Sequence, residues 1–294
     1  MDEKELLERS GGPVTRTRLA ADLRTLGLAQ GDTVMFHTRL SALGYVAGGP
    51  PTVIGALLDV VGADGTLMAS CGWNDAPPYD LAEWPPEWQR AVRAEHPAYD
   101  PALSEADHHN GRLPEALRHW PGAVRSRHPD AGFVAVGAAA GELMADHPWD
   151  GPHGPGSPLA RLAERGGRVL LLGAPLDTIT LLHHAEALAE APGKRYVRYE
   201  QPVLVDGRRE WRSFHDIDTE DGAFDYSAVV SGQEPFTVIA RDMLAAGFGV
   251  RGTVGAAESH LFEAPEVVRF GVGWIEEKLG ERPGARSRSA DPGP

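Results

Sequence analysis

The chain has 294 residues and a formal net charge of −14, from 28 Lys and Arg against 42 Asp and Glu. An acidic balance does not suit the phosphate backbone of a nucleic acid, which is bound by clustered basic residues. It suits a cationic small molecule, because negative potential raises the local concentration of positive ligands. We therefore expect no nucleic-acid partner.

Three further features narrow the class of protein. The first residues are charged rather than apolar and no run of about 18 apolar residues occurs, so we expect a cytoplasmic chain with no signal peptide and no membrane partner. Cys71 is the one cysteine, which excludes an internal disulfide and argues against a structural zinc site. It follows an apolar, strand-like run and is predicted to be a packed, inert thiol.

Apolar periodicity predicts strands that alternate with helices. Leu19, Leu23 and Leu26 mark a first helix with Thr15 as its N-cap, and a strand follows over 33–37. Ser157 and Pro158 form a favoured helix start. In chain order, a helix is predicted over 52–61, a strand over 66–70, a helix over 113–120, a strand over 132–137, a helix over 139–146, a helix from 157, a strand from 168, and helices over 178–192, 236–247 and 264–280.

Two segments depart from this alternation. The stretch 73–110 is rich in Pro and Trp, with a short helical piece near 88–93, and a loop this long is usually functional or disordered. Its aromatic residues favour order. The stretch 196–218 alternates on both sides of Asp206-Gly207 and predicts a hairpin. We expect a single-domain layered α/β fold over 1–294, with a central mostly parallel or mixed sheet, an added β-hairpin and long active-site loops, and with 1–12 and 281–294 as flexible ends.

The sharpest chemical pattern is TITLLHHAEAL, where His183 and Glu186 are three residues apart and share one face of the predicted helix. A carboxylate beside an imidazole fixes its tautomer and stabilises the imidazolium, as a general base requires. His184 points elsewhere. An ordinary surface pair is the alternative, and Asp177 at the preceding strand end either meets a ligand or caps the helix.

Metal chemistry is a weaker reading. The histidines at 183 and 184 do not match H-E-x-x-H, and His108-His109 lie far away in the loop, so no metal site is predicted. Asp216 and Asp218 share a face if the chain is extended. They and the loop residues Asp75 and Asp107 are either solvated or line a pocket for a polycation, and the spacing of a calcium-binding EF-hand is absent.

The loop after the first strand, HTRLSALGYVAGG, combines hydroxyls with glycines. Its backbone amides and the hydroxyls of Thr38 and Ser41 suit a phosphate or a pantetheine chain, although neither a Walker A motif nor G-x-G-x-x-G is present. A plain βα turn is the alternative. In RSRHPD, Arg125 either pairs with a phosphate or belongs to a polar turn.

Six segments, taken together and in order, resemble the aminoglycoside 3-N-acetyltransferase family of antibiotic N-acetyltransferases. They are HTRLSALG, RSRHPD, GPHGPGSPLAR, LLGAPLDTITLLHHAEAL, GTVGAAESHLF and VVRFGVGWIEEKLG, and the resemblance runs from about Thr15 to Gly280. It implies a fold unlike that of the GNAT acetyltransferases. It also implies acetyl transfer from acetyl-CoA to the 3-amino group of a 2-deoxystreptamine aminoglycoside, hence antibiotic resistance.

The resemblance assigns roles. His183 looks like the general base in a direct, ternary-complex attack, with Glu186 as its orienting or substrate-binding carboxylate. One departure is Thr38-Arg39, where members commonly carry two serines, and it leaves the individual coenzyme contacts open. The residues expected to bind the coenzyme are His37, Thr38, Leu40, Ser41, Arg125, Ser126 and Ser157. Those expected to bind the substrate are Asp75, Asp107, His153, Asp216 and Asp218.

Three rival functions remain at this stage. One is an acetyl-CoA-dependent acetyltransferase for another amine, and a second is a metal-dependent hydrolase built on the histidines. The third is a protein that sequesters the drug without catalysis.

Overall fold

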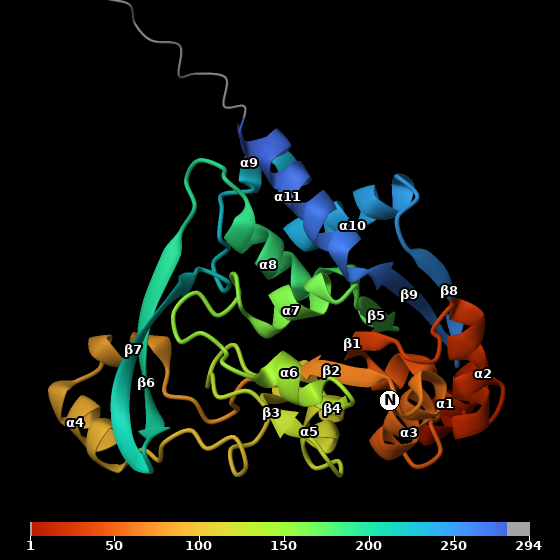
Figure 1. Ribbon diagram of the computed structural model, residues 1–294, viewed down its shortest axis with the longest axis horizontal. Helices are drawn as coiled ribbons and strands as arrows, with labels where there is room; N and C mark the ends of the chain where they lie inside the picture. Colours follow the sequence, from red (N-terminus) through yellow and green to blue (C-terminus); the bar gives the residue numbers. More distant parts are fainter. Residues whose placement is uncertain (1, 281–294) are drawn as a thin grey trace, which may run out of the picture.

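The computed structural model describes residues 2–280, which are built around a seven-stranded mixed sheet of order β3-β4-β2-β1-β5-β9-β8 (Figure 1). The central strand β1 is parallel to β2 and β5, and the outer strands pair antiparallel. The predicted mixed α/β sheet is therefore confirmed. The strands are β1 (Thr33–Thr38), β2 (Thr66–Ser70), β3 (Val124–Arg125), β4 (Phe133–Gly137), β5 (Arg168–Leu172), β8 (Val250–Val254) and β9 (Ala257–Glu263).

Helices cover both faces of this sheet and bury two separate apolar cores. In β5, Val169 and Leu171 enter one core while Leu170 and Leu172 enter the other. This explains why the central strands are continuous apolar runs. One layer holds α2 (Arg16–Leu26), α3 (Pro50–Val61) and α5 (Arg112–Arg118), and the other holds α6 (Ala140–Met144), α7 (Pro158–Glu164), α8 (Leu181–Leu188), α10 (Pro235–Ala245) and α11 (Ala264–Gly280).

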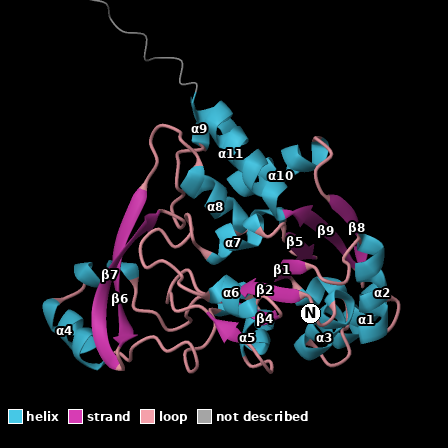
Figure 2. Ribbon diagram, viewed as in Figure 1, coloured by secondary structure: helices cyan, strands magenta, loops and turns pink. Residues whose placement is uncertain are grey.

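The predicted hairpin stands apart from the sheet, beside α4 (Pro86–Glu95) (Figure 2). Its strands β6 (Tyr196–Val205) and β7 (Arg208–Ile217) are joined by Asp206 and Gly207, with φ of 50° and 74°, as a tight two-residue turn requires. A small cluster ties the hairpin to the Trp-rich loop 73–110, so that loop is ordered. The cluster consists of Trp73, Tyr99, Tyr199, Val203 and Phe214.

Several predicted elements differ in the structure. The strands β3, β8 and β9 were not expected, because β3 is two residues long and polar residues interrupt the apolar pattern of β8 and β9. The helix expected over 178–192 is shorter, since a 3-10 turn, η4 (Leu176–Thr178), precedes α8, and α8 ends at Leu188. The remaining elements are η1 (Leu40–Leu43), η2 (Tyr79–Glu83), η3 (His108–Asn110) and α9 (Ser227–Val230).

The two ends expected to be flexible have different outcomes. The first contains helix α1 (Glu3–Ser10), which begins with a capping box between Asp2 and Glu5. The second, 281–294, lies outside the described residues. Within residues 2–280, no helix combines the length and apolar character needed to cross a bilayer.

Helix α8 is fixed by a close approach of α11. A Cβ on Gly271 would lie 2.8 Å from the Cβ of Ala185 and 3.0 Å from a methyl carbon of Leu182. Only glycine therefore allows α11 to pack this tightly on α8. The contact fixes the axis of the helix that carries His183 and Glu186.

Two buried histidines hold two loops, His128 the one between β3 and β4 and His147 the one between α6 and α7. His128 Nδ1 accepts from the backbone N–H of Ala131 at 3.0 Å, and His128 Nε2 donates to the carbonyl of Trp149 at 3.2 Å. His147 Nε2 donates to the carbonyl of Pro152 at 2.9 Å. Burial lowers the pKa of His147 to about 3 and holds the pKa of His128 well below its usual value, so both rings are neutral in the fold.

We therefore predict that acid destabilises the fold through these rings. An unfolded histidine binds a proton near pH 6.5, whereas folded His147 does not until about pH 3. The free energy of unfolding should fall as the pH drops from about 6.5 toward 3, by up to ~1.4 kcal/mol per pH unit for each such ring. Urea unfolding of the wild type and of His147→Asn at pH 7 and pH 5 measures this contribution. Equal losses of stability in the two proteins between these pH values would contradict it.

Candidate active site

A chain of three hydrogen-bonded side chains lies at the start of α8. The Nδ1 of His183 donates to Glu186 Oε2 at 2.8 Å, and the hydroxyl of Tyr226 donates to Glu186 Oε1 at 2.7 Å. Glu186 is 2% exposed, so its carboxylate is held by these two donors rather than by water. Burial, reinforced by the adjacent Glu186, raises the pKa of Tyr226, which keeps its proton. The other ring nitrogen of His183, Nε2, is left as a potential proton acceptor.

Packing fixes the orientation of the His183 ring. Phe236, on α10, meets it edge-on with ring centroids 4.8 Å apart, and the ring of His153 lies 5.4 Å away. His184 faces the interior, as expected, and donates from Nδ1 to the carbonyl of His153 at 2.7 Å. His183 itself keeps 22% of its side chain exposed, so it can reach a ligand.

His183 lines a cavity of about 680 Å³, called here the acidic cavity. Its charged lining is strongly asymmetric, because the guanidinium of Arg195 is opposed by a group of carboxylates. Arg195 is moreover occupied by the backbone carbonyls of Asp221, Gly222 and Phe224 at 2.6 to 3.0 Å. The carboxylates are Asp177, Glu186, Glu220, Asp221, Asp225 and Glu234.

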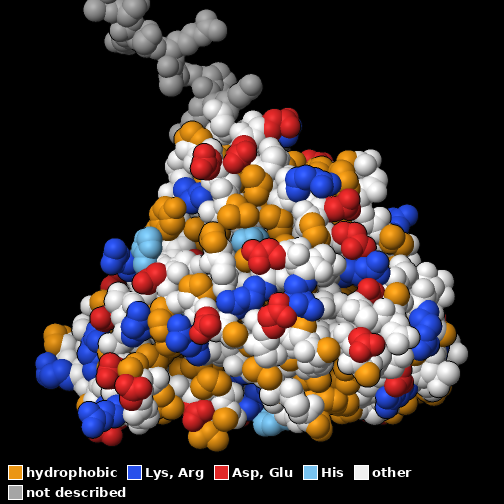
Figure 3. Space-filling view, in the orientation of Figure 1, with side chains coloured by type: hydrophobic (Ala, Val, Ile, Leu, Met, Phe, Trp, Pro, Cys, Tyr) orange, Lys and Arg blue, Asp and Glu red, His pale blue; other side chains and the backbone are white. Residues whose placement is uncertain are grey.

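On the face drawn in Figure 3, acidic side chains are interspersed with Lys and Arg rather than gathered into one block. The acidic cavity is therefore a local concentration of negative charge, and it favours a ligand that carries several positive charges.

A second cavity, of about 1000 Å³, follows β1 and is called here the β1-loop cavity. Four of the residues predicted to bind the coenzyme, His37, Thr38, Leu40 and Ser41, line it. The Nε2 of His37 and the Oγ1 of Thr38 are buried and have no hydrogen-bond partner among residues 2–280. Burial lowers the pKa of His37 to about 4, so this ring is a neutral hydrogen-bonding group. Unsatisfied buried polar atoms at a cavity wall are suited to a ligand.

The two cavities meet at the segment 175–183. Pro175, Thr178 and Thr180 line the β1-loop cavity, whereas Asp177 and His183 line the acidic cavity. The backbone N–H of His183 donates to the carbonyl of Thr180 at 3.0 Å, so the two residues lie on the same first turn. The segment that leads into His183 therefore contributes to the lining of both cavities.

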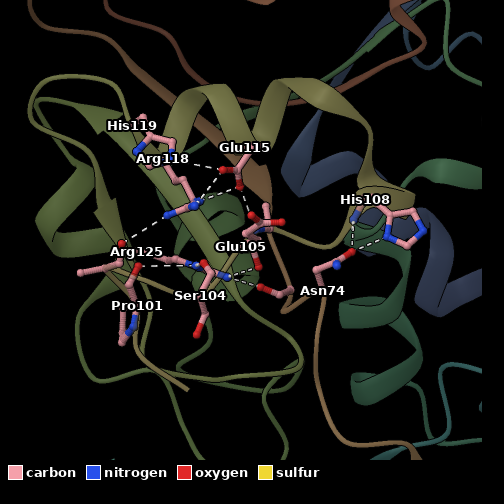
Figure 4. Close-up of polar contacts among 12 residues, drawn as sticks. Asn74, Pro101, Ser104, Glu105, His108, Glu115, Arg118, His119 and Arg125 are labelled. Atoms are coloured by element: carbon pink, nitrogen blue, oxygen red, sulfur yellow. Dashed lines mark hydrogen bonds and ion pairs between the residues drawn. The ribbon is translucent and has the colours of Figure 1, made fainter. Parts of the chain in front are cut away.

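Three residues predicted to bind the coenzyme do not line the β1-loop cavity. Arg125 donates to the carbonyls of Ser104 and Gly72, and its guanidinium stacks on the ring of Tyr99 (Figure 4). Ser126 is buried, and its Oγ accepts from the backbone N–H of Phe133 at 3.0 Å. Ser157 is the N-cap of α7 and accepts from Ala160 N at 3.1 Å. All three side chains have partners within the fold.

The residues predicted to bind substrate also lie outside the lining of the acidic cavity. Asp75 is exposed and accepts from Asn74 at 3.1 Å, and Asp107 caps η3 and bonds to His109 Nδ1 at 2.9 Å. Asp218 accepts from the backbone N–H of Asp221 at 2.9 Å. His153 and Asp216 are buried together and bond to each other at 2.6 Å.

Sequence reasoning missed part of the acidic cavity. Glu220, Asp225 and Tyr226 come from the segment after β7, and Glu234 comes from the start of α10. The acidic run after the hairpin was a usable signal. Glu234 and Tyr226 gave no signal in the sequence. Only the packing of α10, and of the segment after β7, against α8 brings them to His183.

Other candidates for chemistry are weak. Burial raises the pKa of Cys71 to about 11, so the predicted inert thiol fits its surroundings. Within residues 2–280, Asp107, His108 and His109 form a group whose ligand atoms lie within 4.8 Å of one another. Figure 4 shows His108 turned toward the amide oxygen of Asn74, and His109 Nδ1 is bonded to Asp107. These nitrogens are therefore engaged with neighbouring side chains.

The fold is of the layered α/β class, and an imidazole–carboxylate pair lies in the wall of its acidic cavity. The model of the aminoglycoside 3-N-acetyltransferase family matches residues 35–276, and the chain belongs to this family. The predicted resemblance is confirmed.

Individual relatives agree over nearly the whole chain. Aminoglycoside N(3)-acetyltransferase VII of Streptomyces paromomycinus is 75% identical over 97% of this chain and 99% of its own. The solved structure of AAC-IIIb in a binary complex with CoASH is 46% identical over 92% of this chain and 99% of its own, with a TM-score of 0.85. That of AAC-VIa bound to sisomicin is 39% identical over 92% of this chain and all of its own, with a TM-score of 0.84.

The position of Ser157 leads to a prediction. Ser157→Ala should lower the free energy of unfolding by about 1 kcal/mol, because the N-cap of α7 is lost, while the KM for acetyl-CoA stays unchanged. Chemical denaturation and steady-state kinetics measure the two effects. The exposed Ser213→Ala, on β7, is the control and should alter neither. A raised KM with unchanged stability would instead make Ser157 a coenzyme ligand.

Proposed function

We propose that this chain transfers the acetyl group of acetyl-CoA to the 3-amino group of a 2-deoxystreptamine aminoglycoside, with His183 as the general base. The observation that carries the proposal is the position of the His183–Glu186–Tyr226 chain beside the junction of an acidic cavity and a larger, hydroxyl-lined cavity. Membership of the family supplies the reaction class. Acetylation of the amine neutralises it, which gives resistance to the antibiotic.

The β1-loop cavity is suited to acetyl-CoA. Its volume of about 1000 Å³ accommodates an extended coenzyme, and the free Thr38 hydroxyl and His37 imidazole are available to a pantetheine amide. Arg39 and Arg112 also line it, and guanidinium groups pair well with phosphates. Arg39 is the residue that departs from the family's common pattern, so a phosphate contact there would be this chain's own. Because acetyl-CoA is made inside cells, we place the reaction in the cytoplasm.

The acidic cavity is suited to the aminoglycoside. Its carboxylates come from three separate segments around His183, and apart from the buried Glu186 they are suited to accept from ammonium groups. They would hold the remaining amines while the 3-amine faces Nε2 of His183. Holding amine and thioester within ~3–3.5 Å of each other would supply a large part of the rate enhancement.

The chemistry then needs one proton acceptor. As the amine nitrogen bonds to the thioester carbonyl carbon, its proton passes to Nε2 of His183, and the carbon–sulfur bond breaks to release the CoA thiolate. The thiolate takes up the proton that His183 removed from the amine, so the base is regenerated. Glu186 stabilises the transient imidazolium through its bond to Nδ1.

The hydroxyl of Thr180 is the best-placed donor for the developing oxyanion, and Thr38 is a second. Thr180 lines the β1-loop cavity on the same turn as His183, and its Oγ1 lies 3.3 Å from Ser70 Oγ. When Ser70 donates to Thr180, the proton of Thr180 is free to point at the thioester oxygen.

His183→Ala should lower kcat by ~10²–10⁴-fold, the contribution of a general base, and leave the affinity for CoA nearly unchanged. Thiol release in the presence of an aminoglycoside measures kcat, and calorimetry measures the binding of CoA. Cys71 does not interfere with a thiol reagent, since its thiolate fraction is negligible near neutral pH.

The exposed His119→Ala, at the C-cap of α5, provides the matched control and should retain full activity. Wild-type turnover in His183→Ala would remove this imidazole from the mechanism.

The charge of the acceptor is tested separately. Glu220→Gln combined with Glu234→Gln should raise the KM for the aminoglycoside by about tenfold at low salt, at up to ~1 kcal/mol for each exposed pair. The effect should shrink as salt screens these charges. The KM for acetyl-CoA should not change.

Glu87→Gln with Glu95→Gln makes the same change of net charge on α4, where both side chains are exposed. This control pair should leave both KM values unchanged. If the cavity variant behaved like its control for aminoglycosides yet lost affinity for a different amine, the alternative acceptor would be favoured.

A further inference from the structure

A second buried imidazole–carboxylate pair lies directly beside the first. His153 Nδ1 donates to Asp216 Oδ2 at 2.6 Å, and the two side chains are only 7% and 4% exposed. The second oxygen of Asp216 accepts from the backbone N–H of Ile217 at 2.8 Å. The ring centroid of His153 lies 5.4 Å from that of His183. The mechanism described above makes no use of this pair.

The groups around His153 hold it as a cation. Burial alone would lower its pKa, but Asp216, with smaller contributions from Asp130 and Glu186, outweighs burial and raises the pKa above its usual value. Burial raises the pKa of Asp130, and the hydroxyl of Tyr79, which donates to Asp130 at 2.6 Å, acts against this rise.

The neighbouring imidazoles add no positive charge. Burial lowers the pKa of His128, His147 and His184, so all three remain neutral near pH 7. Apart from His183 itself, the titratable groups that face His153 are therefore three neutral rings and the carboxyl groups of Asp216, Asp130 and Glu186.

We propose that His153 is a positioning residue for the reaction: held as an imidazolium by Asp216, it keeps the neighbouring His183 in its free-base form. This inference rests on the proposed role of His183 as the base. It assigns to the pair a function in setting proton affinity rather than in binding substrate.

The argument is one of opposing charges around His183. Glu186 contacts its Nδ1, and the carboxylates of the acidic cavity, Asp177, Glu220, Asp221, Asp225 and Glu234, add to the negative potential that favours a protonated ring. Arg195, which also lines that cavity, offsets them in part. A positive ring packed at 5.4 Å acts against protonation, because like charges in partly buried surroundings repel strongly. It also favours release of the proton after each turnover.

The test is the pH profile of kcat/KM for the aminoglycoside. The acidic limb of this profile is the pH range over which activity is lost as the pH falls. In His153→Gln the midpoint of this limb should move to a higher pH by about 1 unit, the size expected for removing a nearby charge. At a fixed pH below the limb, activity should fall about tenfold, while the plateau above the limb stays close to wild type. Asp216→Asn should move the limb in the same direction, since buried His153 then loses its proton. The double variant His153→Gln with Asp216→Asn should show no larger shift than His153→Gln alone.

His147→Asn is the matched control, because it removes a buried histidine that carries no charge. The acidic limb of its kcat/KM profile should have the same midpoint pH as that of the wild type. An unmoved limb in both His153→Gln and Asp216→Asn would overturn the inference, and if His153→Gln does not fold, Asp216→Asn decides alone.

Histidine-labelled NMR separates this inference from the proposed function. His153 should remain protonated between pH 6 and pH 8, and the midpoint of His183 should rise in Asp216→Asn whether or not His183 is the base. A neutral His153 or an unchanged His183 midpoint contradicts the inference. Retained activity in His183→Ala contradicts the proposed function and leaves the NMR result standing.

Discussion

The account depends on the hydrogen bond from His183 to the buried carboxylate of Glu186. The bond fixes the tautomer, and Tyr226 fixes the carboxylate, so a single nitrogen faces the ligand cavities. The bond in turn depends on backbone packing, since Gly271 lets α11 pack against Leu182 and Ala185 of α8, the residues next to the pair. A larger residue at 271 would displace the helix that holds both partners. The core and the catalytic geometry are therefore coupled at one contact.

The candidate site has two cavities, and the segment 175–183 contributes lining residues to both. One is lined by hydroxyls, glycines and two arginines, and the other by carboxylates, which matches a phosphorylated donor and a polycationic acceptor. In the proposed function, the phosphorylated donor and the polycationic acceptor therefore occupy different cavities, and His183 lines the one proposed for the acceptor. In this proposal, substrate specificity and the chemical step depend on different parts of one layered fold. Part of the net charge of −14 serves to bind the cationic substrate.

Sequence patterns predicted the central strands, most helices and the His183–Glu186 pair, because these follow from apolar runs and helical spacing. They did not predict β8 and β9, whose polar residues interrupt the pattern, or the acidic lining, which three distant segments assemble. Asp216 and Arg125 were expected at ligands because of their charge and the family resemblance. In the fold, a buried imidazole and a set of loop carbonyls use that charge instead. Spacing along the sequence cannot distinguish a charged side chain that binds a ligand from one that stabilises the fold.

Direct transfer between bound substrates is the central claim, and radiolabelled acetyl-CoA tests it most simply. Without an aminoglycoside, the protein should remain unlabelled after denaturation and release no thiol. With a 2-deoxystreptamine aminoglycoside, one acetyl group should reach N3 for each thiol released. A stable acetyl label on the protein, or a burst of thiol without acceptor, would show a covalent intermediate and contradict the account.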